Sequence, residues 1–182
     1  DSNIIGIKTG LKDFDLKIGG LHNSDLIIIA GRPSMGKTAF ATNIAYNIAK
    51  SNNDKSNQKS PLRNKVLFFS LEMSSEQLAT RILAESSGIP SEKIRTGNIS
   101  KNDFTRVINS SEHLTKLSLF IDDTPALSIS AIRTRARRLK RKEGLDLIIV
   151  DISSIISLLT KTDPSKACSA SKLDGCLSFI LL

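Results

Sequence analysis

Short apolar runs alternate with longer amphipathic segments through most of this chain. The apolar runs predict strands at 26–30, 66–71, 117–121 and 147–150. The segments between them carry apolar residues at helical spacing, which predicts helices over 38–50, from 74 to 87, from 100 onward and over 129–143. Such alternation is typical of an α/β domain built on a mainly parallel sheet with flanking helices.

The predicted helix ends carry recognisable capping residues. Ser74 and Gln77 fit a capping box, and Gly88 is placed to stop the helix that follows. Ser100 and Asp103 form a similar start for the next helix. These local signals agree with the apolar periodicity, so the helix boundaries rest on two kinds of observation.

Two stretches lack this organisation. Residues 51–64 are polar and aperiodic, which predicts an exposed, mobile loop. From residue 152 onward, short apolar bursts and Ser-rich gaps give no strand–helix unit that fits the sheet. We therefore expect a partial core over 1–151 and an atypical tail over 152–182. The tail and the missing initiator Met suggest a fragment, truncated or read out of frame near residue 151.

Composition narrows the class of protein without naming its partner. The 182 residues are 40% hydrophobic and 24% charged, as in ordinary soluble domains. A net charge of +8 favours an anionic partner such as a nucleotide, a nucleic acid or an acidic surface. The two cysteines, Cys168 and Cys176, are too few for a disulfide framework or a metal site. Apolar runs too short to span a bilayer predict no membrane association and a cytoplasmic location.

Residues 31–38 match the complete phosphate-binding loop pattern G-x-x-x-x-G-K-S/T, between a predicted strand and a predicted helix. In such loops, backbone N–H groups and the helix N-terminus surround phosphate oxygens. Lys37 would reach the β- and γ-phosphates, and the Thr38 hydroxyl would bind Mg²⁺. The alternative is a Gly-rich turn without a ligand. The predicted nucleotide-binding residues are Gly31, Arg32, Pro33, Ser34, Met35, Gly36, Lys37, Thr38 and Ala39.

Carboxylates follow three of the predicted strands, at the edge where ligands of parallel sheets bind. Asp151 follows an apolar run of the Walker B form and is predicted to hold Mg²⁺. Glu72 could accept a proton from the water that attacks the γ-phosphate, or it could be an acid that favours the start of the next helix. Spacing alone leaves these two roles open. We interpret Asp122 and Asp123 as a strand end and turn.

One predicted helix is strongly basic. Its apolar residues fix the side that faces the core, so most of its charges project outward. Such runs usually form a solvated face, and the alternative is a contact with nucleic acid or another subunit. Without aromatic side chains among the charges, the helix offers no platform for stacking single-stranded bases. The basic residues are Arg133, Arg135, Arg137, Arg138, Lys140, Arg141 and Lys142.

Taken in order, the segments GRPSMGKTAF, SLEMS, SGIPSEKIRTGNIS and LFIDDTPALSISAIRTRARRLKRKEGLDLIIVD resemble the ATPase domain of DnaB-type replicative DNA helicases. The resemblance runs from Ile4 to Asp151. It implies a RecA-like P-loop NTPase fold and a ring hexamer that couples ATP hydrolysis to unwinding of duplex DNA at the replication fork. It also implies ATP and Mg²⁺ as cofactors, Glu72 and Lys37 as catalytic residues, and Thr38 and Asp151 as metal ligands. The partners implied are single-stranded or forked DNA, primase and a helicase loader.

The tail departs from the family pattern. Ile152-Ser153-Ser154 stand where the family usually has Tyr-Leu-Gln. We find no later core strands, DNA-contacting loops or arginine finger there, so we expect poor ATP hydrolysis and self-association through exposed apolar surface. The alternative is a nucleotide-binding or interaction module without turnover. A small-molecule kinase is a third hypothesis, although the tail shows no acceptor pocket or basic lid.

Overall fold

A computed structural model describes residues 5–32, 34–51, 64–151 and 178–181. Its centre is a five-stranded sheet of order β1-β5-β4-β2-β3, in which every pairing is parallel. The strands are β1 (Leu26–Ile28), β2 (Val66–Ser70), β3 (Leu119–Asp122), β4 (Leu147–Asp151) and β5 (Ser178–Leu181). The parallel arrangement brings the carboxyl ends of all these strands to one edge of the sheet.

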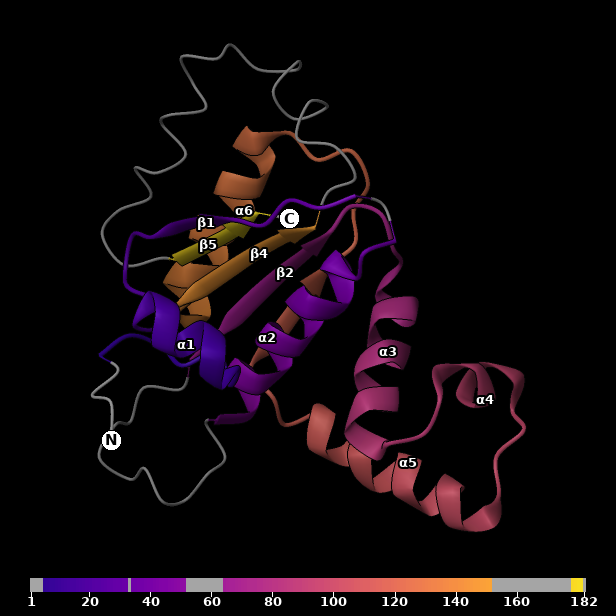
Figure 1. Cartoon of the computed structure of the whole chain (residues 1–182). Helices are drawn as coiled ribbons and strands as arrows, with labels where there is room; N and C mark the ends of the chain where they lie inside the picture. Colours follow the sequence, from indigo (N-terminus) through magenta and orange to yellow (C-terminus); the bar gives the residue numbers. More distant parts are fainter. Residues whose placement is uncertain (1–4, 33, 52–63, 152–177, 182) are drawn as a thin grey trace.

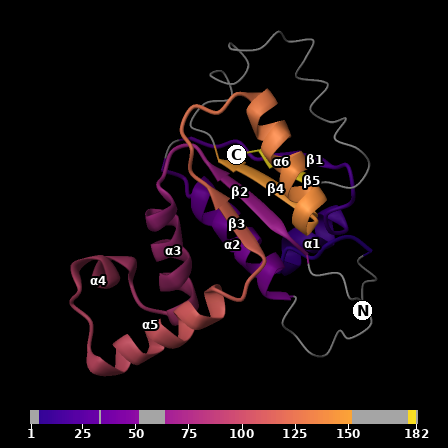
Figure 2. The same cartoon turned by 180° about the vertical axis from the view of Figure 1, so that it is seen from behind.

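Helices cover both faces of the sheet (Figures 1 and 2). The short helix α1 (Lys12–Ile18) and the long helix α2 (Lys37–Ser51) lie on one face, and α6 (Ile129–Glu143) lies on the other. Alternate side chains of β2 follow this division, because Phe68 packs in the core cluster of α2 and Phe69 in that of α6. Both central strands β2 and β4 are buried along their whole length, which explains their continuous apolar sequences.

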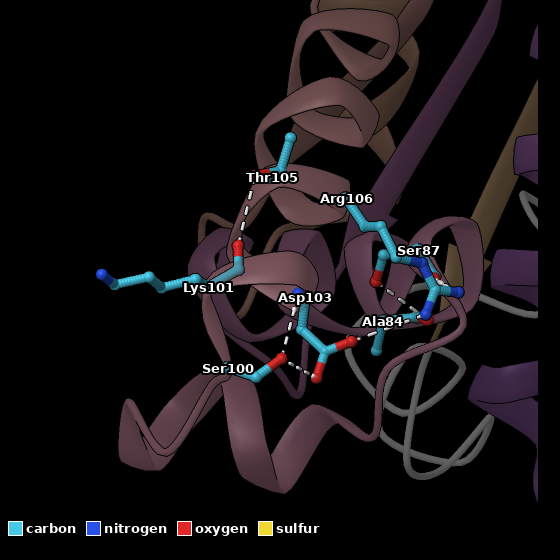
Figure 3. Close-up of polar contacts among 7 residues, drawn as sticks. All are labelled: Ala84, Ser87, Ser100, Lys101, Asp103, Thr105 and Arg106. Atoms are coloured by element: carbon cyan, nitrogen blue, oxygen red, sulfur yellow. Dashed lines mark hydrogen bonds and ion pairs between the residues drawn. The ribbon is translucent and has the colours of Figure 1, made fainter.

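The helices α3 (Ser75–Ser87), α4 (Ser91–Thr96) and α5 (Lys101–Leu114) form a lobe beside the sheet (Figure 1). Ser74 and Ser100 cap α3 and α5 by accepting hydrogen bonds from the N–H groups of Gln77 and Asp103. Arg106 of α5 donates to the Ser87 carbonyl at the end of α3, over 2.6 Å (Figure 3). The predicted caps are confirmed, and the arginine ties the two long helices together.

The predicted strands and helices between residues 26 and 151 are confirmed, with ends shifted by a few residues. The sequence pattern did not predict α1, α4 or β5. The expectation that the tail adds no strand is wrong, because β5 lies between β1 and β4. Most of the predicted loop 51–64, the tail cysteines Cys168 and Cys176, and residues 152–154 lie outside the described residues. None of the helices that the structure describes is long and apolar enough to cross a membrane.

Candidate nucleotide-binding site

The phosphate loop connects the end of β1 to α2, which begins at Lys37. Ser34 and Gly36 adopt left-handed backbone conformations with φ of 65° and 82°. The loop turns tightly here, since the Met35 N–H donates to the Arg32 carbonyl over 3.3 Å. This backbone course leads into the N-terminus of a fifteen-residue helix, whose unpaired N–H groups and dipole favour an anion. Pro33 lies outside the described residues.

A cavity of about 560 Å³ adjoins the loop. Its size lies within the range of small-molecule sites. Met35 and Lys37 of the loop both line it, together with Phe40 from the first turn of α2. The full lining comprises Ile29, Ala30, Gly31, Arg32, Met35, Gly36, Lys37 and Phe40. The loop therefore combines a helix N-terminus with adjacent space for a ligand.

Asp151, the last residue of β4, lies beside the start of α2. The residue is only 1% exposed, its carboxylate is hydrogen-bonded to the Thr38 side chain, and its Oδ2 atom has no hydrogen-bond partner. Burial raises the pKa of Asp151, as does the negative charge of Glu72, whereas Thr38, Lys37 and Arg81 lower it. These interactions show that the fold brings the predicted site residues Lys37, Thr38, Glu72 and Asp151 together.

The chemistry of this group fits a magnesium ion bound together with phosphate. Thr38 offers a hydroxyl oxygen, and Asp151 offers a buried carboxylate oxygen that lacks a partner. Oxygen ligands of this kind suit Mg²⁺, which usually keeps waters and phosphate oxygens as its other ligands. Among the described residues, no group of three or more His, Cys, Asp or Glu side chains could hold a metal ion. Thr38 and Asp151 would therefore supply two oxygen ligands to a metal bound beside the phosphates.

Glu72 follows β2 in a turn that is fixed on two sides. The Ser70 hydroxyl donates to the Met73 carbonyl over 2.7 Å and accepts from the Met73 N–H over 3.3 Å. The Leu71 N–H donates to the Asp151 carbonyl over 3.1 Å. The Glu72 side chain itself is exposed. The turn thus holds Glu72 at the rim beside Asp151, while its carboxylate stays open to water.

The neighbouring pair Asp122 and Asp123 has structural contacts. Arg135 of α6 donates to both carboxylate oxygens of Asp122, over 2.8 and 2.7 Å. Burial alone raises the pKa of Asp122, but the hydrogen bonds from Arg135 and Thr124 lower it below its ordinary value. Asp123 accepts from the Ser75 N–H at the start of α3 over 2.8 Å. The interpretation of this pair as a strand end and turn agrees with these contacts.

Sequence reasoning missed Arg81 on α3. Its positive charge acts on Asp151, so it lies at the same rim as Glu72. The sequence contains a faint signal, since Arg81 is the one basic residue between Lys65 and Lys93. The spacing between Glu72 and Arg81 in the sequence does not predict that Arg81 lies near Asp151 at the end of β4.

Comparison with known families decides which P-loop proteins this site belongs with. The family model of the DnaB-like helicase C terminal domain matches residues 6–174. The chain belongs to this family. The match continues past Asp151, where we expected the family resemblance to end, so that limit was set too early. The division into a core over 1–151 and a separate tail stays a prediction.

Relatives of the DnaB-like family show the same relationship. Replicative DNA helicase DnaB of Rickettsia bellii (strain RML369-C) is 52% identical over 163 residues, which are 90% of this chain and 33% of that protein. The chain thus spans about a third of the length of the curated relatives it matches.

Solved structures agree on the fold. A structure described as an ATPase domain matches with a TM-score of 0.81 at 24% identity, covering 100% of this chain and 64% of that one. A DnaB-like replicative helicase, whose structure is described with its interactions with primase, matches with a TM-score of 0.79 at 23% identity, covering 98% and 43%. These neighbours confirm the predicted RecA-like fold.

Proposed function

We propose that this chain is the ATP-binding part of a replicative helicase motor, which couples ATP hydrolysis to unwinding of duplex DNA at the replication fork. One observation carries the proposal: Lys37, Thr38 and Glu72 all act on Asp151 at one edge of the sheet, although the four residues come from three separate segments of the chain. Membership of the DnaB-like family supports ATP as the nucleotide and DNA as the substrate of the whole protein.

Each residue has a role that follows from its place. The loop N–H groups and the Lys37 ammonium bind the phosphates, and Thr38 and Asp151 hold Mg²⁺ through oxygen. When bound, the metal neutralises charge on the β- and γ-phosphate oxygens. Glu72 is solvent-accessible at the same rim, so its carboxylate can orient a water and accept its proton. Water attack on the γ-phosphate therefore needs no other base from this chain.

Equilibrium titration with a fluorescent ATP analogue and Mg²⁺ tests the assignment. We expect Lys37→Ala to weaken binding about 30-fold or more, because it removes the charge that pairs with the phosphates. Glu72→Gln should keep the affinity and abolish hydrolysis. Lys93→Ala, on the exposed surface of α4, is the matched control. Unchanged affinity in Lys37→Ala would show that the loop is not the nucleotide site.

A second function is binding of nucleotide without turnover. The sequence after Asp151 favours it, because Ile152-Ser153-Ser154 stand where the family usually has Tyr-Leu-Gln. Single-turnover ATP hydrolysis, with and without single-stranded DNA, distinguishes the two. Bound ATP that stays intact under both conditions would support the module without turnover and contradict a motor role for this chain.

The proposed partners follow from the family. They are single-stranded or forked DNA, further copies of the chain in a ring hexamer, primase and a helicase loader, in the cytoplasm. The DnaB-like neighbour whose structure is described with its interactions with primase supports the primase assignment. Sedimentation of the chain with MgATP, followed by titration of purified primase, tests assembly and partner binding in turn. A monomer under all conditions would count against the ring.

A further inference from the structure

Most of the net charge of this chain is concentrated on α6. The helix contains seven basic residues and a single acidic one, giving +6 of the +8 carried by the whole chain. Basic residues in a last turn are favoured by the helix dipole, which accounts for Lys140, Arg141 and Lys142. It does not account for Arg138, which lies a turn earlier. The dipole alone therefore leaves part of the charge unexplained.

The outward side of α6 presents an exposed basic stripe, formed by Arg138, Arg141 and Lys142. Arg141 and Lys142 stand three and four positions after Arg138, so these side chains are neighbours on one side of the helix. The opposite side is fixed by Ile132 and Ala136, which are buried against the sheet. Like charges at this spacing repel each other by a few tenths of a kcal/mol per pair. The stripe is thus mildly unfavourable for the isolated chain.

Nearby carboxylates neutralise little of the stripe. Glu143 lies 3.8 Å from the Lys65 ammonium and 3.9 Å from that of Lys142, whose side chain is 79% exposed. Exposed pairs at such distances contribute little. Asp122, the last residue of β3, is engaged by Arg135, which lies outside the stripe.

The stripe lies at the C-terminal end of α6, just before the start of β4. The end of α6 leads through Gly144 into the start of β4, and Lys65, just before β2, contacts Glu143. The stripe is therefore at the edge where the strands begin, whereas Asp151 is at the edge where they end. A ligand on the stripe would leave the phosphate loop accessible.

We propose that the basic stripe of α6 binds the phosphate backbone of double-stranded DNA. Arg side chains match phosphate geometry, and the stripe, about 6 Å long from the helical rise, spans about two phosphates of one strand. The helix has no aromatic residue, so it lacks the stacking surface that single-strand binding uses. The choice of DNA rests on the proposed function, and the surface rests on α6 alone.

Fluorescence anisotropy with a labelled duplex of about 20 bp tests this contact in the full 182-residue chain, over about 50 to about 200 mM KCl. The test variant is the triple substitution R138A/R141A/K142A. The control, K93A/R95A/K101A, removes the same charge from exposed positions of α4 and α5. We expect the test variant to lose at least about tenfold in affinity and about 2 in the slope of log K against log salt. The control should change by less than about threefold.

Several outcomes would overturn the proposal. Equal losses of duplex affinity in both triple variants would show that binding depends on the total charge of the chain and not on the stripe. An unchanged duplex affinity in the test variant would show that the stripe does not bind DNA and instead faces solvent or an acidic protein. If the test variant lost affinity only for a single strand of the same length, the stripe would bind single-stranded rather than double-stranded DNA. If the alanine variant fails to fold, R138K/R141K must retain duplex binding, while R138Q/R141Q must lose it.

Binding of MgATP, measured on the same samples, separates the two proposals. Loss of ATP binding in Lys37→Ala with duplex binding intact supports both. Wild-type protein that binds duplex through the stripe but does not bind ATP would contradict the proposed function and support this inference. Wild-type protein that binds ATP but does not bind duplex through the stripe would support ATP binding and contradict this inference.

Discussion

At the residue scale, Asp151 combines a proposed metal-binding role with a cost in stability. Burial raises its pKa above the ordinary value of 3.8, with Glu72 adding to the effect and Thr38 opposing it. The folded chain therefore binds this proton more tightly than the unfolded chain does. The contribution of Asp151 to folding is fully present below 3.8 and is lost as the pH rises through the raised pKa.

We therefore expect Asp151→Asn to raise the free energy of unfolding of the nucleotide-free chain at pH 7 and to flatten its pH dependence above 3.8. Urea unfolding across acidic and neutral pH measures this, with the exposed Asp13→Asn as control. The same variant should lose the stabilisation that MgATP gives the wild type. A less stable Asp151→Asn at pH 7 would contradict the cost assigned to burial.

Asp15 holds the N-terminal segment against the helix that follows the phosphate loop. Its carboxylate accepts from the Thr9 N–H and hydroxyl over 2.9 and 2.7 Å, and from the Gly10 N–H over 3.2 Å. Gly10 packs so closely on Asn47 of α2 that an added Cβ would lie 2.8 Å from the Asn47 amide nitrogen. Asp15 thus couples this segment to the position of α2.

Asp15→Ala should lower the free energy of unfolding by about 3 kcal/mol, because it leaves the two buried donors of Thr9 and the partly buried bond of the Gly10 N–H without their charged acceptor. Asp13→Ala, on the exposed side of the same helix, should change it by less than about 0.5 kcal/mol. Urea unfolding of both variants makes the comparison. Similar values for the two would mean that the hydrogen bonds of Asp15 contribute no more than those of a surface acid.

At the element scale, the lobe of α3, α4 and α5 depends on polar ties between its helices (Figure 3). Arg106 donates to the Ser87 carbonyl at the end of α3, where the helix dipole also favours a cation. Its second contact, 3.5 Å to Asp103, is exposed and contributes little. The bond to the end of α3 is therefore the one that matters for the lobe.

Arg106→Ala should destabilise the lobe by about 1 kcal/mol, the usual net value of one hydrogen bond at a partly exposed site. Hydrogen exchange of the α3 and α5 amides measures the local effect, with Lys101→Ala on the same helix as control. We expect faster exchange in α3 and α5, with the central strands unaffected. Exchange that rises equally throughout the sheet would show that the lobe does not open on its own.

Elements with strong local signals were predictable from the sequence, and those held by distant contacts were not. The helices α3 and α5 have both an apolar stripe and a capping serine. By contrast, α1 follows Leu11 and α4 follows Pro90, neither of which provides a side-chain cap. Strand β5 pairs with β1 and β4, and partners so distant in sequence leave no periodicity in a four-residue run.

The residues of the site also divide into those that local sequence signals predict and those that depend on distant packing. The loop motif and the strand-end acids Glu72 and Asp151 were predictable, because parallel strands must end at a common edge. Arg81 was not, because its position depends on how α3 packs back beside the sheet. The structural use of Asp122 also depends on packing, since its partner Arg135 comes from a helix on one face of the sheet.

At the scale of the whole molecule, β1 lies at one edge of the sheet and pairs only with β5 among the described strands. Leu26 and Ile28 on this strand are 50% and 57% exposed. An edge strand with exposed apolar side chains can pair with another chain. The strand that leads into the phosphate loop is therefore the predicted site of self-association.

Ile28→Lys should raise the dissociation constant of self-association by at least about tenfold, because it places a charge on the edge and removes apolar contact area. Sedimentation velocity over a concentration series measures the change. Leu16→Lys is the control, since Leu16 is 61% exposed but lies on α1 rather than on the sheet edge. Equal effects of the two substitutions would point to general apolar contacts, and a wild-type chain that stays monomeric at all concentrations would contradict association through β1.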